Sequence, residues 1–194
     1  MTIGLLKSNF QLNTKRLIIR SYKKNDYKEW KRAYSSLEKK KNKWDFNPVS
    51  LDDEKKLTSH FSNLLLHNKK NSSQDYKYHF GIFEKKSGNL VGVTMIMDIT
   101  RNIFQNANIG YHVLNPYWGK GYGKEIARGT LKIAFSYLSL HRVEAAIDPH
   151  NIRSIKMVKN VGFRKEGRSR NRLFLHGRWK DMMIYAITKE DKIL

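Results

Sequence analysis

The first half of the chain alternates short runs of β-branched and aromatic residues with longer amphipathic stretches. The short runs predict strands, at 16–20, 78–83 and 90–97. Apolar residues recurring at three- and four-residue steps predict helices, at 27–37 and from a capping sequence at 50–53 to residue 65. A Ser-Gly-Asn turn predicts that the last two strands form a hairpin, and the polar run 68–75 predicts a loop.

The second half of the chain is arranged around a glycine-rich turn at 115–124. Strand patterns lie on both sides of this turn, at 107–114, 141–148, 173–175 and 179–188. Amphipathic patterns predict two helices, at 123–138 and 152–160. A helix that connects two strands of one sheet makes a right-handed crossover and leaves those strands parallel. The turn therefore follows the carboxyl end of a strand, where α/β sheets usually hold ligands.

The composition of the turn suits a phosphate group. Gly119, Gly121 and Gly123 permit backbone conformations that a Cβ forbids, and they let a ligand approach bare N–H groups. The following helix begins with unpaired donors and the positive end of its dipole, and Lys120 and Lys124 add positive charge. The turn therefore predicts a phosphate or pyrophosphate site, with tight packing of the turn as the alternative explanation.

Two familiar phosphate motifs do not fit this turn. A Rossmann fingerprint starting at Gly119 requires glycine at its sixth position, where this chain has Lys124. A Walker A loop requires Ser or Thr after its Gly-Lys pair, where this chain has Glu125. Both classes of nucleotide-binding protein are thereby excluded for this segment.

Composition sets broader limits on function. A chain of 194 residues predicts one domain over 1–194. Its 38 Lys and Arg against 17 Asp and Glu give a formal charge of +21, which either solubilises the surface or attracts RNA, an acidic membrane or a multiply phosphorylated cofactor. The absence of cysteine excludes disulfides, thiolate catalysis and Cys-ligated metals.

Two further expectations follow from what the chain lacks. The seven histidines show no ligand spacing, so we expect no metal site. No apolar run approaches the roughly 18 residues of a membrane span, so we expect a soluble, cytoplasmic protein without membrane contact.

Three motifs in a fixed order resemble the GNAT superfamily of acetyl-coenzyme-A-dependent N-acetyltransferases. They are Ile109-Gly-Tyr followed by the segment 118–125, then Asn151-x-x-Ser154, then Val161-Gly-Phe163. Other segments resemble the ribosomal-protein-alanine N-acetyltransferases of that superfamily: 13–17 with Arg20 and Asp26, Trp44, Gly81 with Val91-Gly-Val93, and 181–185. The resemblance covers essentially the whole chain, and its specificity comes from the joint order and spacing of the motifs.

The resemblance implies an α+β fold with a bent mixed sheet, flanked by helices, whose two central strands splay apart to admit the pantetheine arm of acetyl-CoA. Those strands would be 107–114 and 141–148. It also implies a set of cofactor-binding residues: main-chain groups at Val113 and Leu114 for the arm, the turn for the pyrophosphate, and Asn151 and Ser154 for the pantetheine. The turn residues are Trp118, Gly119, Lys120, Gly121, Tyr122, Gly123 and Lys124. Trp118 departs from the Gln or Arg typical of the family.

The resemblance assigns the acid role to Ser154, which would give a proton to the departing thiolate with Asn151 one turn away. Many relatives use a tyrosine at the position that Val158 occupies here, so the role falls to the serine. Many relatives carry Glu where this chain has Asn108, which cannot accept a proton. Glu144 and His112 are then the nearby candidates for a general base, and each also has an ordinary structural explanation.

The resemblance favours a protein α-amine as acceptor, specifically the N-terminal alanine of a ribosomal protein. Residues expected to line the acceptor site are Trp44, Phe46, Asn108 and His176. An α-amine with a pKa near 7.7 to 8.0 loses its proton far more readily than a lysine near 10.4, which suits an enzyme with a weak base. Two alternatives stay open: an acetyltransferase for another small amine, and a basic module that binds RNA or the ribosome.

Overall fold

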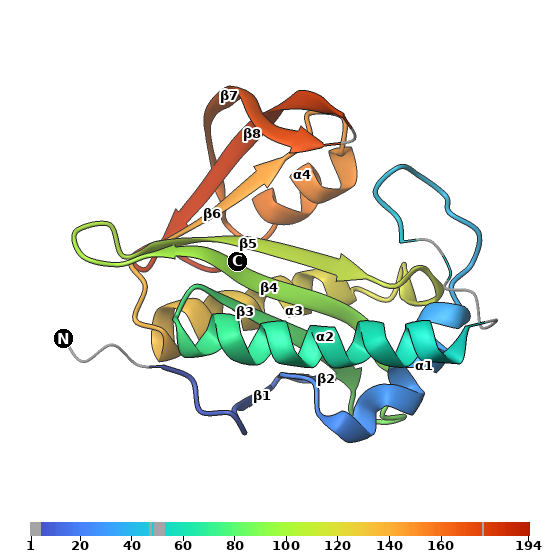
Figure 1. The fold of residues 1–194 in the computed structure, drawn as a ribbon. Coiled ribbons are helices and arrows are strands. Elements are labelled where there is room, and N and C mark those ends of the chain that lie inside the picture. The colour runs from blue at the N-terminus through green and yellow to red at the C-terminus, as the bar shows by residue number, and fades with distance from the viewer. Residues whose placement is uncertain (1–4, 47, 49–52, 176) are drawn as a thin grey trace.

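The computed structural model describes residues 5–46, 48, 53–175 and 177–194. They form a mixed sheet of eight strands in the order β1-β2-β3-β4-β5-β6-β8-β7 (Figure 1). The strands are β1 Gln11–Asn13, β2 Leu17–Arg20, β3 Lys77–Glu84, β4 Leu90–Thr100, β5 Asn106–Val113, β6 Arg142–Ile147, β7 Arg164–Leu175 and β8 Arg178–Thr188. All neighbours are antiparallel except β5 and β6, because a crossover helix joins these two.

Helices cover both faces of the sheet. The α-helices are α1 Tyr27–Ser35, α2 Glu54–Ser73, α3 Tyr122–Lys132 and α4 Ile152–Lys159. Short helical turns precede α1 at Lys24–Asp26 (η1) and α3 at Asn115–Tyr117 (η2), and a π-helical segment, Ile133–Tyr137 (η3), continues α3. Figure 1 shows α2 in front of the sheet and α3 behind it.

Each face of the sheet has its own apolar core. Behind the sheet, Ile126 and Leu131 of α3 are fully buried against Ile19 and Phe80 in a cluster that also contains Val158 of α4. In front, Trp30 of α1 and Phe61 of α2 are buried with apolar residues of β3 and β4. The three- and four-residue spacing seen in the sequence is the reason that each helix buries a single stripe.

The two central strands part as the resemblance predicted. β5 and β6 pair only at Asn106 with Arg142, Ala107 with Val143, and Asn108 with Glu144. Beyond these pairs β5 continues to Val113 and β6 to Ile147 without pairing to each other. The two strands therefore leave an opening at their carboxyl ends, beside the glycine turn.

Two predicted boundaries were wrong. The polar run 68–75 was expected to be a loop, but α2 continues to Ser73. Asn68 explains the extension: its Nδ2 donates to the His79 carbonyl at 2.8 Å and its Oδ1 accepts from the His79 N–H at 3.1 Å, which fixes the end of the helix to β3. The strand expected at 173–175 is longer and begins at Arg164. The prediction missed this start because β7 exposes most of its side chains and so lacks an alternating apolar pattern.

Candidate functional site

A cleft of about 670 Å³ opens where β5 and β6 part. Its wall comes from the end of β5, the glycine turn, the start of α4 and the segment between α1 and α2. Of the predicted cofactor residues, it is lined by Val113, Trp118, Gly119, Gly121, Tyr122, Gly123, Lys124, Asn151 and Ser154. Segments far apart in the sequence therefore meet beside the glycine turn, where the sequence predicted a ligand site.

The backbone of β5 directs polar groups into this opening. The Leu114 N–H donates to the Val91 carbonyl at 2.9 Å, on the β4 side. Main-chain groups alternate in direction along an antiparallel ladder, so those of Tyr111 and Val113 point toward the side that β6 has left. The Val113 carbonyl there accepts a hydrogen bond from Trp118 Nε1 at 2.7 Å.

Leu114, also expected to bind the cofactor, does not line the cleft. Its N–H is taken by Val91, and its carbonyl accepts from the Tyr117 N–H at 2.9 Å. The side chain is fully buried. The residue therefore anchors the turn to β4 and presents no main-chain group to the cleft.

The glycine turn has the geometry that its composition predicted. Gly119 and Gly121 have φ angles of +78° and +72°, which residues with a Cβ rarely adopt. A Cβ on Gly119 would meet nothing within 4 Å, so the backbone faces open space there. Within the described part of the chain, the N–H groups from Gly119 to Lys124 have no backbone acceptor. The turn can therefore present several bare donors to an anion.

An ion pair between Arg16 and Glu125 holds this turn in place, and no local pattern in the sequence indicates it. Arg16 donates from Nε to Glu125 Oε2 at 2.7 Å and from Nη1 to the Lys120 carbonyl at 2.7 Å. Glu125 Oε1 also accepts from the Arg16 N–H at 2.7 Å and from Thr14 Oγ1 at 2.6 Å. Lys120 itself is exposed and does not line the cleft. Its Nζ lies over the Tyr117 ring.

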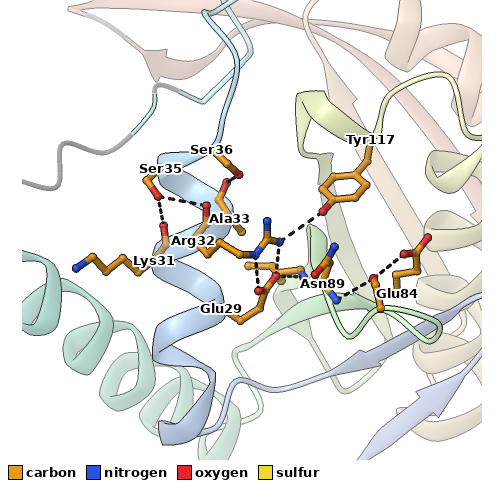
Figure 2. A network of polar contacts seen from close by, with 11 residues as sticks. Glu29, Lys31, Arg32, Ala33, Ser35, Ser36, Glu84, Asn89 and Tyr117 are labelled. Carbon is orange, nitrogen blue, oxygen red and sulfur yellow. Dashed lines mark hydrogen bonds and ion pairs between the residues drawn. The ribbon is translucent and has the colours of Figure 1, made fainter.

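A polar network fixes the segment just before the turn (Figure 2). Arg32 of α1 forms an ion pair with Glu29 at 2.6 Å and reaches the Tyr117 hydroxyl at 3.5 Å. Glu29 also accepts from the Leu90 N–H at 2.5 Å, which links α1 to β4. Because Tyr117 lines the cleft, this network positions one of its walls.

Trp118 closes another side of the cleft. The Arg153 guanidinium of α4 lies 3.9 Å from the centroid of the indole ring, and the Lys41 ammonium lies 5.7 Å from it. Both are cation–π contacts. The tryptophan that departs from the family pattern thus connects the turn to α4 and, through its hydrogen bond to Val113, to β5.

Asn151 and Ser154 lie at the start of α4 as predicted. Asn151 is the N-cap, and its Oδ1 accepts from the Ser154 N–H at 3.2 Å. Tyr111 of β5 was not among the predicted site residues. Its hydroxyl is buried with no hydrogen-bond partner in the described chain. Burial raises the pKa of Tyr111, and the neighbouring Ser154 hydroxyl and Arg153 partly oppose this.

Strand alternation was the signal that could have identified Tyr111. Residues two apart on a strand share a face, so Ile109, Tyr111 and Val113 lie together. Since Val113 was already predicted to meet the cofactor, Tyr111 belongs on the same wall.

Another part of the cleft lining is aromatic and acidic. It includes His112, and burial lowers the pKa of this histidine to about 4, so the imidazole is neutral at pH 7. The centroids of the Phe46 and His112 rings are 4.0 Å apart. Trp44 lines the cleft. Asp45, not foreseen, is buried in the same wall and accepts from the Lys41 N–H at 2.8 Å. This aromatic and acidic part of the lining could receive an amine.

Two further predicted site residues, Glu144 and Asn108, do not line the cleft. Glu144 pairs with Arg142 at 3.0 Å and lies 3.8 Å from Arg172, where β5 and β6 are still paired, so its position gives no support to a catalytic role. Asn108 lies at the same level and donates to Asp98 at 3.3 Å. His176 lies outside the described residues.

The described ranges hold no group of three or more His, Cys, Asp or Glu side chains that could bind a metal ion. None of the helices in the same ranges has the length and apolar character needed to cross a membrane.

The chain is similar to proteins of known family. Residues 16–164 match a family model described as Acetyltransferase (GNAT) domain. The probable N-acetyltransferase YjcK of Bacillus subtilis (strain 168) is 37% identical over 118 residues, covering 61% of this chain and 65% of that protein. The ribosomal protein uS5-alanine N-acetyltransferase of Escherichia coli (strain K12) is 29% identical over 118 residues, 61% of each chain. These alignments span less than two thirds of either relative.

A solved structure extends the similarity to the fold. Mycobacterium smegmatis RimJ in complex with CoA-disulfide superposes with a TM-score of 0.72 at 25% identity, covering 90% of this chain and 82% of that one. Together with the match to the family model, this superposition confirms the GNAT fold expected from the sequence.

Proposed function

This chain belongs to the GNAT acetyltransferase family, and from that premise we propose that it transfers the acetyl group of acetyl-CoA to an amine. The observation that carries the proposal is the opening between β5 and β6, bordered by a turn with unpaired N–H groups. Acetyl-CoA supplies a thioester whose carbonyl carbon an amine attacks, with the CoA thiolate as leaving group.

The residues of the cleft fit this cosubstrate. The bare amides from Gly119 to Lys124, at a helix N-terminus, suit the pyrophosphate. The main chain of Val113 faces the opening at a level where a pantetheine arm would pass, although its carbonyl is shared with the Trp118 indole. Asn151 and Ser154 line the other side. The structural relative that carries CoA-disulfide supports the same ligand class.

Proton transfer in the proposed reaction involves two hydroxyls and one imidazole. Ser154, with Tyr111 beside it, donates a proton to the departing thiolate, and these two groups lie on the cofactor wall of the cleft. His112 also lines the cleft and is neutral at pH 7, so it accepts a proton from the attacking amine directly or through water. We do not retain Glu144 as the base, because its carboxylate is paired outside the cleft.

We further propose that the acceptor is a protein α-amine, with the N-terminal alanine of a ribosomal protein as the specific target. The Escherichia coli relative acts on such an alanine by its name. An imidazole with a pKa of about 4 is a weak base, so an acceptor that loses its proton easily is favoured. The α-amine has an advantage of about 3 to 4 kcal/mol in deprotonation over a lysine side chain.

Steady-state rates with two peptides test this proposal. One begins with a free N-terminal alanine and contains no lysine, and the other is blocked at its N-terminus and contains one lysine. The chain has no cysteine, so a thiol reagent detects released CoA alone. We expect the free N-terminus to react faster, and a faster blocked peptide would defeat the α-amine assignment. If a small polyamine were the best acceptor, the ribosomal target would be wrong while acetyl transfer would stand.

A glycine substitution tests the cofactor site separately. Gly121→Val places a β-branched side chain at a φ of +72°, which costs about 1 to 2 kcal/mol and narrows the turn. We expect CoA binding, measured by calorimetry, to be lost while the circular dichroism spectrum keeps its wild-type shape. Folded Gly121→Val that binds CoA with unchanged affinity would contradict the assignment.

A further inference from the structure

A second groove, of about 560 Å³, lies on the other side of the glycine turn. It runs between the β1–β2 connection and α3, and it shares only Gly121 and Lys124 with the cleft. Figure 1 shows β1 and β2 along the lower edge of the molecule, with α3 behind the sheet. We call it the basic groove, because its lining includes Lys15, Arg16, Lys124, Arg128 and Lys132.

The cations on α3 form a regular row. Lys124, Arg128 and Lys132 are four residues apart and exposed, so they follow one another along one face of the helix at steps of ~6 Å. Like charges at this spacing weaken a helix slightly. The helix thus carries three neighbouring positive charges on an exposed face that does not pack against the apolar core.

Little of this charge is neutralised within the protein. Glu125 is the only acidic side chain that lines the groove among the described residues, and it is engaged by Arg16 and Thr14. Lys15, Lys124 and Lys132 form no ion pair with any residue that the structure describes. Arg128 donates from Nε to the Leu194 main-chain oxygen at 2.6 Å. The groove is therefore a concave surface of strongly positive potential.

We propose that the basic groove binds the phosphate backbone of single-stranded or looped RNA. A row of cations spaced along a groove matches a ligand with a row of negative charges, whereas a small anion needs only one or two of them. Its described lining contains no aromatic side chain on which bases could stack, so the contacts are to phosphates and carry little sequence preference. The net charge of +21 adds long-range attraction to the same kind of partner.

This proposal does not depend on acetyl transfer. The basic groove uses residues of α3 and the β1–β2 connection that the proposed reaction does not use, apart from the two shared at the turn. An enzyme whose acceptor lies in a ribonucleoprotein would gain local concentration from such a groove.

Binding to a fluorescently labelled single-stranded RNA of about 20 nucleotides, followed by anisotropy over a range of salt concentrations, tests the groove. The variant carries Arg128→Gln and Lys132→Gln, and the matched control carries Lys69→Gln and Lys70→Gln on an exposed face of α2. Both remove two positive charges. We expect the groove variant to bind at least several-fold more weakly and to lower the slope of log affinity against log salt by about 1.4. The control should keep the wild-type slope.

Four results would overturn the proposal. Equal losses in both variants would mean that RNA responds only to overall charge, and no loss in either would mean that the groove is not used. Displacement of RNA by saturating free CoA would assign the groove to the cosubstrate. Binding to vesicles of anionic phospholipid that is stronger than RNA binding and lost in the groove variant would assign it to a membrane surface instead.

Acetyl transfer to a short peptide separates this proposal from the proposed function. The groove variant should turn over the peptide at the wild-type rate, since Arg128 and Lys132 do not line the cleft. Wild-type protein that binds RNA but fails to turn over any amine would support the groove and contradict the proposed function. Wild-type protein that turns over the peptide but does not bind RNA would support the proposed function and contradict the groove.

Discussion

Two hydroxyl groups, from different elements, face the same point in the cleft. Ser154 comes from the first turn of α4 and Tyr111 from β5, and they are neighbours only because β5 and β6 have parted. Val158 occupies the helical position where many family members carry a tyrosine. Tyr111 supplies a tyrosine hydroxyl from the strand side instead, with a pKa raised by burial. In the proposed reaction Ser154 donates the proton and Tyr111 supports it.

Substitution of the two hydroxyls tests that division of roles. We expect Ser154→Ala to lower kcat by about 100-fold, the lower end for loss of a general acid, and Tyr111→Phe to lower it by a smaller factor. KM for acetyl-CoA should change little in Tyr111→Phe. The measurement is release of free thiol at saturating substrate, and a larger loss in Tyr111→Phe would reverse the assignment.

Buried histidines make stability depend on pH. Burial lowers the pKa of His79 and of His112 to about 4, against about 6.5 in an unfolded chain. Above pH 6.5 both states are neutral and the full stability is present. Between pH 6.5 and 4 the unfolded state takes up protons that the folded state refuses, so the free energy of unfolding falls. Below pH 4 the folded histidines also protonate and this loss stops.

His79→Gln tests this linkage away from the cleft. The wild-type free energy of unfolding should fall by about 1 to 3 kcal/mol between pH 7 and 4.5 on account of His79 alone. The variant should lose that part of the pH dependence even if its stability at pH 7 is lower. Urea denaturation at the two pH values measures it, and an unchanged difference between them would contradict the prediction.

At the scale of elements, α3 connects the core to the site. Its apolar stripe is buried behind the sheet, while its first turn presents amides and Glu125 to the glycine turn. Arg16 joins that carboxylate to the Lys120 carbonyl, and its guanidinium lies 4.6 Å from the centroid of the Tyr122 ring. The β1–β2 connection therefore braces the turn without lining the cleft.

Glu125→Gln should loosen the turn and leave the fold intact. Hydrogen bonds to a charged group contribute about 1.5 to 3 kcal/mol, so we expect an increase of about 10-fold in the dissociation constant of CoA. Glu54→Gln, which removes an exposed ion pair with Lys31 on the other face, is the control. Calorimetry measures CoA binding, and equal affinities in the two variants would argue against a positioning role for Glu125.

At the scale of the whole molecule, one sheet has an apolar core on each face, and the cleft opens where its two central strands part. Polar contacts join the two sides of the cleft: Lys43, between α1 and α2, pairs with Asp148 after β6 at 3.0 Å, and the Arg153 guanidinium of α4 lies over the Trp118 ring. The apolar core behind the sheet also joins both sides, since it contains Ile126 of α3 and Val158 of α4.

A core substitution on α3 should destabilise the entire fold. Leu131 is fully buried, and Leu131→Ala should lower the free energy of unfolding by about 2 to 5 kcal/mol. Leu66→Ala on α2, where the leucine is 63% exposed, should change it by less than about 0.5 kcal/mol. Urea denaturation measures both free energies of unfolding. A similar decrease in the two variants would contradict the assignment of Leu131 to the core.

Local patterns in the sequence predicted most elements and the ligand-binding turn. The periodicity of α1 and α3, the Ser-Gly-Asn hairpin and the glycines at 119, 121 and 123 act within a few residues, and the structure has each of them. β7 was largely missed because an exposed strand leaves no apolar alternation to detect. The end of α2 was missed because a distant strand fixes it through Asn68.

The sequence by itself determined where the glycine turn forms and which helix faces are buried, because backbone freedom and apolar spacing are local properties. Only the tertiary structure decided which side chains meet in the cleft. It brought Tyr111 beside Ser154, joined Arg16 to Glu125 and left Leu114 and Glu144 out of the cleft lining. Those outcomes depend on how the strands pair and part, and pairing joins residues whose separation in the chain no local pattern records.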